Sequence, residues 1–363
     1  MKILLIGEYS NVHNTLAQGL RTLGHEVCVI SNGDFWKNYP RDIDVSRTAG
    51  KLGGLRLLAR LWTLLPKMCG YDVVQLINPM FFELKAQRLK FFYHWLHKHN
   101  KKVVLGAFGM DYYWVYECTY NKPLRYSDFN FGEQVRTNQE ALRDQHDWLG
   151  TEKERLNKLI AESCNGIVTG LYEYQVCYES HYPQKTRFIP YPIIPQTTVP
   201  EIRQQEKLRI FVGISRQRSA YKGTDIMLKA AEAIVSKYPE RAELQKAEGV
   251  PFAQYQLLLD TCDVILDQLY SYTPAMNALL AMSKGIIVVG GGEPENYEIL
   301  GETELRPIIN VEPNYDNVCN ELEQLVLHPE RVPVLKQQSV EYIARHHDFI
   351  KVAQRYIDFY EQC

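Results

Sequence analysis

The chain alternates short apolar runs with longer segments of helical periodicity, and it does so in two successive series. This alternation is typical of βα units that build a parallel sheet. Between the two series lies Pro190–Glu206, PYPIIPQTTVPEIRQQE, whose four prolines disfavour a continuous helix or a central strand. We therefore expect an α/β fold with two domains and a linker, in agreement with about 150 residues per domain for 363 residues.

The periodicity assigns strands and helices to both series. In the first series we expect strands Lys2–Ile6, Glu26–Ser31, Val73–Leu76, Lys102–Ala107, Gly166–Thr169 and Thr186–Ile189, and helices Val12–Leu23, Leu55–Leu65, Leu84–His97, Glu152–Ser163 and Glu173–Ser180. In the second we expect strands Arg209–Val212, Ala242–Glu248, Val264–Leu266, Ile286–Val289 and Pro307–Val311, and helices Thr224–Lys237, Phe252–Asp260, Met276–Ser283, Tyr315–Leu327 and Phe349–Gln362.

Composition limits the class of protein. Hydrophobic residues make up 45% of the chain and charged residues 23%, which is ordinary globular usage. The formal net charge of −2 argues against a general nucleic-acid binder. The eight cysteines form no CxxC or CxxH pair, so we interpret them as reduced packing residues. The opening MKILLIGEYS looks like a first strand rather than a secretion signal, and no uninterrupted apolar run of about 18 residues occurs, so we expect a cytoplasmic protein.

The first strand-to-helix junction of the second series carries charge. The predicted strand ends near Gly213, and Ser215, Arg216 and Lys222 follow in the loop before the helix. Two cations beside a helix N-terminus can hold a diphosphate. The alternative is a solvated basic loop.

The corresponding junction of the first series contains Gly7, Asn11 and His13. Small and polar residues at the carboxyl end of a first strand are placed where doubly wound sheets bind ligands, and we expect these three residues to bind the acceptor. The junction lacks the GxGxxG spacing of a dinucleotide loop, so a role in NAD binding is weakly supported. A plain helix-capping turn is the alternative.

The junction of the second series, with its strand-Gly-x-x-Arg-x5-Lys-Gly pattern, together with Leu23–Val27 (LGHEV), Cys262–Leu269 (CDVILDQL) and Ala281–Val289 (AMSKGIIVV), resembles glycosyltransferase family 4 over nearly the whole chain. The resemblance implies a GT-B fold, α/β, with two Rossmann-like domains facing a cleft. It implies an acceptor-binding domain at 1–195, a nucleotide-sugar-binding domain at 205–345, and a final helix at 346–363 that returns to the first domain. It also implies retention of anomeric configuration, no bound metal, and neutralisation of the departing diphosphate by Arg216 and Lys222.

The chain departs from the family at two positions. The family carries two glutamates eight positions apart, and the alignment puts Tyr272 and Leu280 there. We expect Tyr272 and Asn277 to contact the donor, and Glu293 or Glu298, which follow a run of three glycines, to accept ribose or sugar hydroxyls. A flexible turn is the alternative for that run. The second domain also has one strand fewer than the family between its first two helices.

The acceptor side has one acidic candidate. Asp111 follows the strand Lys102–Ala107, in a loop where the family often has a catalytically important acidic residue or histidine. We expect Asp111 to act in catalysis, with service as a helix N-cap as the alternative.

The segment Lys51–Lys102 is strongly basic. It contains ten lysines and arginines against two acids, interleaved with leucines and aromatic residues. Such basic amphipathic helices can rest on an anionic membrane surface. The alternative is that the apolar faces only pack on the sheet.

The sequence therefore predicts a retaining, metal-independent hexosyltransferase that moves a sugar from a UDP- or GDP-sugar to a hydroxyl of a glycan or lipid-linked glycan. It would work in polysaccharide biosynthesis, at the inner face of the membrane, with no permanently bound cofactor. Two alternatives stay open: a non-catalytic GT-B module that partners an active transferase, and an enzyme similar to nucleotide-sugar epimerases.

Overall fold

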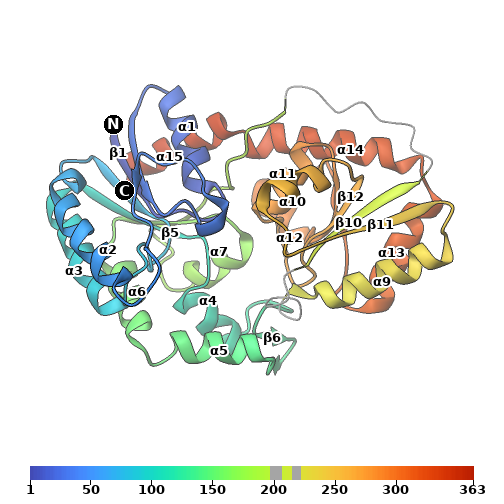
Figure 1. Ribbon diagram of the computed structural model, residues 1–363, viewed down its shortest axis with the longest axis horizontal. Helices are drawn as coiled ribbons and strands as arrows, with labels where there is room; N and C mark the ends of the chain where they lie inside the picture. Colours follow the sequence, from blue (N-terminus) through green and yellow to red (C-terminus); the bar gives the residue numbers. More distant parts are fainter. Residues whose placement is uncertain (197–206, 215–221) are drawn as a thin grey trace. The chain divides into compact units, whose positions relative to one another are not determined.

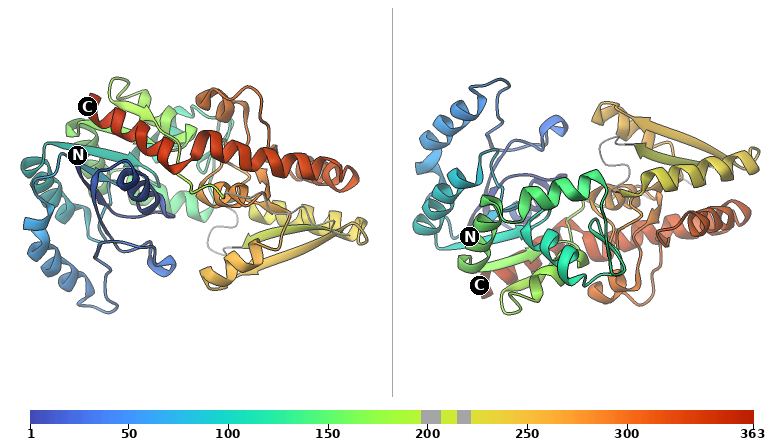
Figure 2. Two further views of the ribbon diagram at one scale, coloured as in Figure 1. Left: turned by 90° about the horizontal axis from the view of Figure 1, so that it is seen from above. Right: turned by 90° about the horizontal axis from the view of Figure 1, so that it is seen from below.

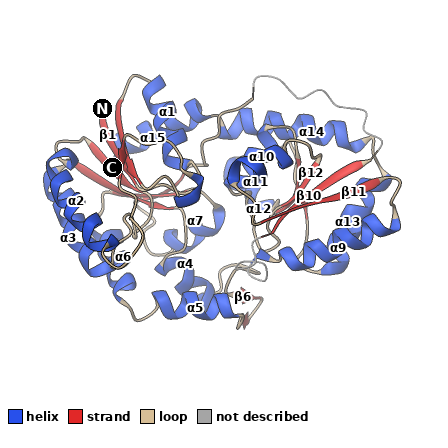
Figure 3. Cartoon of the chain, in the orientation of Figure 1, coloured by secondary structure: helices blue, strands red, loops and turns tan. Residues whose placement is uncertain are grey.

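The computed structural model describes residues 1–196, 207–214 and 222–363. The chain forms two compact units, each with a parallel sheet (Figures 1 and 3). Unit 1 consists of Met1–Pro123, Leu142–Pro192 and Phe349–Cys363, and unit 2 of Leu124–Ala141 and Ile193–Asp348. Three segments group with unit 2 although the sequence-based division placed them in the first domain or in the final helix. They are residues 124–141, 193–195 and 346–348.

Unit 1 is built on a seven-stranded sheet in the order β3-β2-β1-β4-β5-β8-β9, with every pair parallel. The strands are β1 (Lys2–Ile6), β2 (Glu26–Ser31), β3 (Ile43–Asp44), β4 (Val73–Leu76), β5 (Lys102–Ala107), β8 (Gly166–Thr169) and β9 (Thr186–Phe188). Branched aliphatic residues dominate the central strands, and nearly all are buried, as expected for a sheet covered on both faces.

Helices cover both faces of this sheet (Figure 2). They are α1 (Val12–Thr22), α2 (Gly53–Leu64), α3 (Ala86–His99), α4 (Tyr112–Tyr116), α6 (Glu152–Ser163), α7 (Tyr172–Glu179) and α15 (Phe349–Gln362); α5 (Gln139–Trp148) begins in unit 2 and ends in unit 1. Helix α15 packs closely on α1, because a Cβ placed on Gly19 would lie only 2.3 Å from the carbonyl oxygen of Phe349. The returning final helix expected from the resemblance is therefore confirmed.

Unit 2 contains a five-stranded parallel sheet in the order β11-β10-β12-β13-β14. Its strands are β10 (Leu208–Ile214), β11 (Ala242–Glu248), β12 (Val264–Leu266), β13 (Ile287–Gly290) and β14 (Ile309–Asn310). Its helices are α9 (Thr224–Lys237), α10 (Phe252–Leu259), α11 (Met276–Ser283), α12 (Pro294–Leu300), α13 (Tyr315–Leu327) and α14 (Arg331–Tyr342), and a short antiparallel hairpin joins β6 (Asn130–Phe131) to β7 (Gln134–Val135).

The strands and helices expected from periodicity are found, and most bounds agree within two residues. The single strand β11 between α9 and α10 confirms the shortened second domain. The prediction missed β3, α4, α5, the β6–β7 hairpin, α12 and α14. All eight cysteines are free thiols, as expected.

Candidate functional site

A chain of polar side chains crosses the carboxyl edge of the unit 2 sheet. Asp267 follows β12 directly, and its carboxylate accepts a hydrogen bond from Asn277 Nδ2 at 3.2 Å. The Tyr255 hydroxyl donates to Asn277 Oδ1, also at 3.2 Å. Gly213, near the end of β10, lies against the Tyr255 ring, because a Cβ there would be 2.9 Å from the ring. This edge therefore brings together groups from β10, α10, β12 and α11, at the place where parallel α/β sheets bind ligands.

Lys222 adds a positive charge to this edge. The Leu269 amide donates to the Lys222 carbonyl oxygen at 2.9 Å, which ties the start of α9 to the residues that follow β12. Burial raises the pKa of Asp267, while the charge of Lys222 and the hydrogen bond from Asn277 oppose the rise. Ser215 and Arg216 lie outside the described residues. Of the predicted donor residues, Gly213, Asn277 and Lys222 thus lie together, and sequence reasoning missed Tyr255 and Asp267.

Tyr272 and Glu293 are next to each other, but both already have protein partners. The Tyr272 ring packs on Tyr126, with centroids 4.7 Å apart, and its hydroxyl accepts from the Tyr126 amide at 3.3 Å. The Glu293 carboxylate accepts from Arg125 Nη2 at 2.8 Å and from the Tyr126 hydroxyl. The Arg125 guanidinium also lies 5.0 Å from the centre of the Tyr272 ring.

This arrangement changes the interpretation of Glu293. Both carboxylate oxygens are engaged by residues 125 and 126, and the residue is buried, so its carboxylate is not presented to a ribose in this structure. The segment Leu124–Ala141 comes from the first half of the sequence, yet it belongs to unit 2 and covers this position. Arg136 of the same segment lies over the Tyr270 ring at 4.0 Å.

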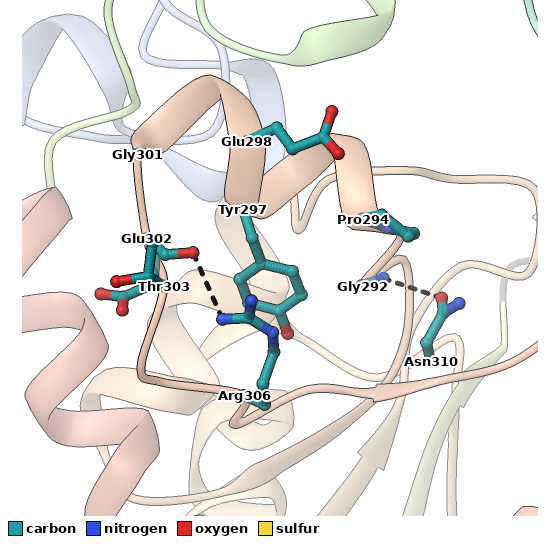
Figure 4. Close-up of a pocket in the computed structure, with 9 residues that line it drawn as sticks. All are labelled: Gly292, Pro294, Tyr297, Glu298, Gly301, Glu302, Thr303, Arg306 and Asn310. Atoms are coloured by element: carbon teal, nitrogen blue, oxygen red, sulfur yellow. Dashed lines mark hydrogen bonds between the residues drawn. The ribbon is translucent and has the colours of Figure 1, made fainter.

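Glu298 lines a separate cavity of about 660 Å³ (Figure 4). Arg306 stacks on the Tyr297 ring at 4.2 Å, and the Gly292 amide donates to Asn310 Oδ1 at 3.1 Å. In Figure 4 the Glu298 carboxylate points away from the Arg306 guanidinium. Of the two predicted acids, Glu298 is exposed and Glu293 is buried, so only Glu298 has a carboxylate open to a ligand.

In unit 1, His13 is part of the packing between α1 and the sheet. Its Nδ1 donates to the Gly7 carbonyl oxygen at 2.8 Å, and its Nε2 accepts from Gln75 Nε2 at 3.1 Å. Burial lowers the pKa of His13 to about 3, although the hydrogen bond to Gly7 opposes the fall, so the ring is neutral. Because the ring is buried and both nitrogens have partners, His13 supports the junction and does not present a donor or acceptor to a ligand.

Gly7 and Asn11 shape the same junction. Gly7 has φ of +85°, and a Cβ there would meet the Ile77 side chain at 2.2 Å, so only glycine fits without rearrangement. Asn11 has φ of 74° and accepts through its side-chain oxygen from Asn14 Nδ2 at 2.8 Å. The chain turns here into α1, and Asn11 stands at the N-cap position without a side-chain hydrogen bond to the helix amides.

Asp111 is fully buried at the start of α4. Its Oδ1 accepts from the Trp114 amide at 2.9 Å and its Oδ2 from the Tyr178 hydroxyl at 2.8 Å. Burial raises its pKa to about 7, and these two hydrogen bonds oppose the rise. The structure thus shows the N-cap of the alternative interpretation, with no carboxylate oxygen exposed for catalysis.

Sequence reasoning also missed polar groups at the carboxyl edge of the unit 1 sheet. Glu8 is buried and accepts from the His13 and Asn14 amides at 3.2 and 2.8 Å. Burial raises its pKa to about 8, against the effect of those amides. Asp34, after β2, accepts from the Ser10 amide at 2.8 Å and so joins the two loops that follow β1 and β2.

Among the described residues, no three His, Cys, Asp or Glu side chains are close enough together to hold a metal ion. Within the same part of the chain, no helix is both long enough and apolar enough to span a bilayer.

Comparison with known proteins gives matches only among solved structures, since no family model and no curated protein matches the chain. Sucrose-phosphate synthase from Thermosynechococcus elongatus is 13% identical with a TM-score of 0.65, covering 100% of this chain and 99% of that one. HepE from Anabaena, solved with UDP-glucose, is 13% identical with a TM-score of 0.59, covering all of both chains. UDP-GlcNAc 2-epimerase from Neisseria meningitidis, bound to UDP-GlcNAc, is 13% identical with a TM-score of 0.54 over the whole of both chains. At this identity the likeness shows the fold, and the chain has the GT-B fold with two Rossmann-like units.

Proposed function

We propose that the protein is a glycosyltransferase that moves a sugar from a nucleotide-sugar donor to a hydroxyl of a glycan or lipid-linked glycan. The observation that carries the proposal is the cluster of Lys222, Asp267, Asn277 and Tyr255 at the carboxyl edge of the unit 2 sheet. The whole-chain likeness to HepE, a protein solved with UDP-glucose, supports a nucleotide sugar as the donor.

Each residue of the cluster has a role in this proposal. Lys222, with Arg216 from the neighbouring loop, neutralises the charge that develops on the departing diphosphate. Gly213 lets the Tyr255 ring lie against the end of β10, and Asn277 holds Asp267, which faces the Lys222 charge. The Glu298 carboxylate remains the candidate to accept hydrogen bonds from the hydroxyls of the nucleotide sugar. The Gly7–Asn11 turn remains the candidate loop that contacts the acceptor glycan.

The finer features follow the resemblance to glycosyltransferase family 4. We propose transfer with retention of configuration, without a bound metal, and with a hexose-type donor in polysaccharide assembly. Arg216 and Lys222 would supply the charge neutralisation that a divalent cation provides in other transferases.

The proposal is tested by binding and turnover with UDP, GDP and a panel of their sugars. A nucleotide that binds the folded protein at 100 times its Kd should stabilise it by about 2.7 kcal/mol, readily seen in a thermal-shift assay. We expect nucleotide release to require an acceptor and to persist in EDTA. Free sugar released without acceptor would favour the epimerase-like alternative, and binding without any turnover the non-catalytic one. No thermal shift with any nucleotide would refute the proposal.

We further propose that the basic segment Lys51–Lys102 contacts an anionic membrane surface. On α2 and α3 the structure leaves several large apolar side chains exposed, including Leu55, Trp62 and Phe91. Trp62 and Phe91 stack on each other with centroids 4.6 Å apart, so the two helices share one exposed aromatic cluster. Exposed apolar side chains among many lysines and arginines match the requirements of the lipid interface.

We expect the full chain to bind vesicles containing an acidic phospholipid and to dissociate in 1 M salt, where the Debye length falls to about 3 Å. Trp62→Ala should weaken this binding severalfold, because the side chain no longer enters the lipid interface. Tyr315→Ala, which removes an exposed aromatic ring from α13, serves as the control. Equal binding to neutral and acidic vesicles would contradict the electrostatic contribution.

A further inference from the structure

Two large aromatic side chains stand out of unit 1 at the carboxyl edge of its sheet. Phe35 is 60% exposed and Trp36 is 64% exposed, on the short helical turn η1 (Phe35–Lys37) that follows β2. No other neighbouring pair of aromatic residues in the described part of the chain is exposed to this degree. Adjacent exposed aromatic residues cost solvation free energy and commonly mark a place where a ligand binds.

The backbone that carries this pair is strained. Asp34, Phe35 and Asn38 have φ of 59°, 57° and 50°, and Ser10 and Asn11 in the facing loop have φ of 50° and 74°. A bulky residue such as phenylalanine rarely adopts positive φ. Strain of this kind persists only where surrounding contacts impose it, and it is concentrated at functional sites.

Those contacts are a fixed polar network. The Asp34 carboxylate accepts from the Ser10 amide at 2.8 Å and from Lys37 Nζ at 2.6 Å. Lys37 Nζ also donates to Ser10 Oγ at 3.1 Å. The side chains of Asp34 and Lys37 are 13% and 22% exposed, so the network is largely shielded from water and holds the turn in place.

The position of the turn matches a ligand site. It follows β2, and Ser10 follows β1, its parallel neighbour. In sheets of this kind ligands bind outside the carboxyl ends of the strands, near the point where strand order reverses. In the unit 1 sheet that reversal lies between β1 and β4. Ser10 follows β1 directly beside it, and the aromatic turn lies one strand farther out, tied to Ser10 through Asp34.

We infer that Phe35 and Trp36 form a stacking platform for a sugar ring of the acceptor glycan, an assignment that rests on the proposed glycosyl transfer. The apolar face of a pyranose lies flat on an aromatic ring, while its hydroxyls need polar groups at the rim. Ser10, Asp34 and Lys37 place polar groups next to the aromatic pair, and their mutual hydrogen bonds fix the pair in position. This platform of Phe35 and Trp36 would select the acceptor glycan and not the nucleotide-sugar donor.

Charge and size favour a sugar over other occupants. Lys37 is paired with Asp34, and Arg41 with Asp44 at 2.7 Å, so the turn lacks the excess positive charge that an anionic lipid surface needs. Two aromatic side chains cover roughly 150–250 Å² each. That area suits one or two sugar rings and is far below the roughly 1,000 Å² of a stable protein interface.

The test measures the binding of maltotriose, cellotriose and N-acetylchitotriose to the full chain by calorimetry, with UDP titrated in parallel. At least one oligosaccharide should bind and should protect tryptophan fluorescence from iodide quenching. Trp36→Ala should weaken that binding about tenfold, as for a central aromatic contact, while Trp36→Phe retains most of it. Tyr315→Ala, at an exposed ring on α13, should leave it unchanged, and UDP affinity should not change in any of these variants.

Each outcome has a defined meaning. Oligosaccharide binding that is unchanged in Trp36→Ala overturns the platform, and so does UDP binding with no oligosaccharide binding, although the proposed transfer then stands. Oligosaccharide binding that depends on Trp36 without any nucleotide binding supports a carbohydrate platform and removes the transferase proposal. If Trp36→Ala instead reduces only vesicle binding or self-association, the occupant is a membrane or a second copy, and the inference is wrong. If neither UDP nor any oligosaccharide binds, both proposals fail.

Discussion

Gly19→Ala should lower the free energy of unfolding by about 1–3 kcal/mol, the usual cost of overpacking a closely packed interface. The new methyl group would lie 2.3 Å from the Phe349 carbonyl oxygen and 2.8 Å from Ala353 Cβ. Because the nearest atom belongs to the backbone of α15, relief requires the helix to move away from α1. Urea unfolding gives the change in stability, and hydrogen exchange of the α15 amides shows where it occurs.

The matched control is a glycine in α2 of the same unit. A Cβ on Gly54 would have its nearest neighbour, the end of the Arg47 side chain, at 3.6 Å, which is ordinary contact. Gly54→Ala should therefore raise stability by about 0.5–1 kcal/mol, because alanine loses less backbone entropy than glycine when a helix forms. Equal effects of the two substitutions would contradict the close packing of α1 on α15.

Lys222→Ala should weaken the binding of UDP, or of whichever nucleoside diphosphate the protein prefers, by about 1.5–3 kcal/mol, roughly ten- to a hundredfold. A hydrogen bond between an ammonium group and a phosphate oxygen is charge-assisted, so its loss exceeds that of a neutral contact. Calorimetric titration of the wild-type and variant proteins measures the difference.

Lys237 provides the comparison at the other end of α9. Lys237 is exposed and forms an ion pair with Glu323, and such a surface pair contributes little to stability. Because Lys237 is the last residue of α9, it lies away from the strand ends that would hold the nucleotide. Lys237→Ala should change the nucleotide affinity less than twofold. If Lys222→Ala also binds with wild-type affinity, the assignment of the diphosphate site to the start of α9 is wrong.

The sequence was informative where local pattern alone determines structure. Central strands such as β1 and β12 are short apolar runs buried on both faces, and long helices such as α9 have clear periodicity, so both were predicted with correct bounds. The two-residue strands β3, β6 and β7 and the helices α4 and α12, of five and seven residues, are too short for a periodic pattern to emerge. Helix α14 has a proline in its first turn, a residue type that disfavours a helical interior and so weakens the helical pattern there.

The candidate site was only partly predictable, because much of it depends on contacts between distant segments. Lys222 and Gly213 are found from the loop that joins strand to helix. Asp267 lies within the segment Cys262–Leu269 that carries the family resemblance. Its position directly after a buried strand was the signal that could have marked it as a site residue. In contrast, nothing in the sequence links Arg125 and Tyr126 to Glu293, more than 160 positions away. Burial of His13 and Asp111 likewise follows from packing and not from residue type.

The assignment of residues 124–141 to unit 2 and of α15 to unit 1 has a consequence for biosynthesis. A nascent chain that ends at Pro192 already contains the segment Leu124–Ala141, but Tyr272 and Glu293, which Tyr126 of this segment contacts, have not yet been made. The same chain contains α1 without α15, so the surface around Gly19 is exposed until translation has passed Asp348. Neither unit is therefore one continuous stretch of polypeptide. Unit 2 can complete its folding only once Asp348 has been synthesised, and unit 1 only once Phe349–Cys363 has followed. Fragments cut at residue 192 or 348 should therefore need chaperone protection.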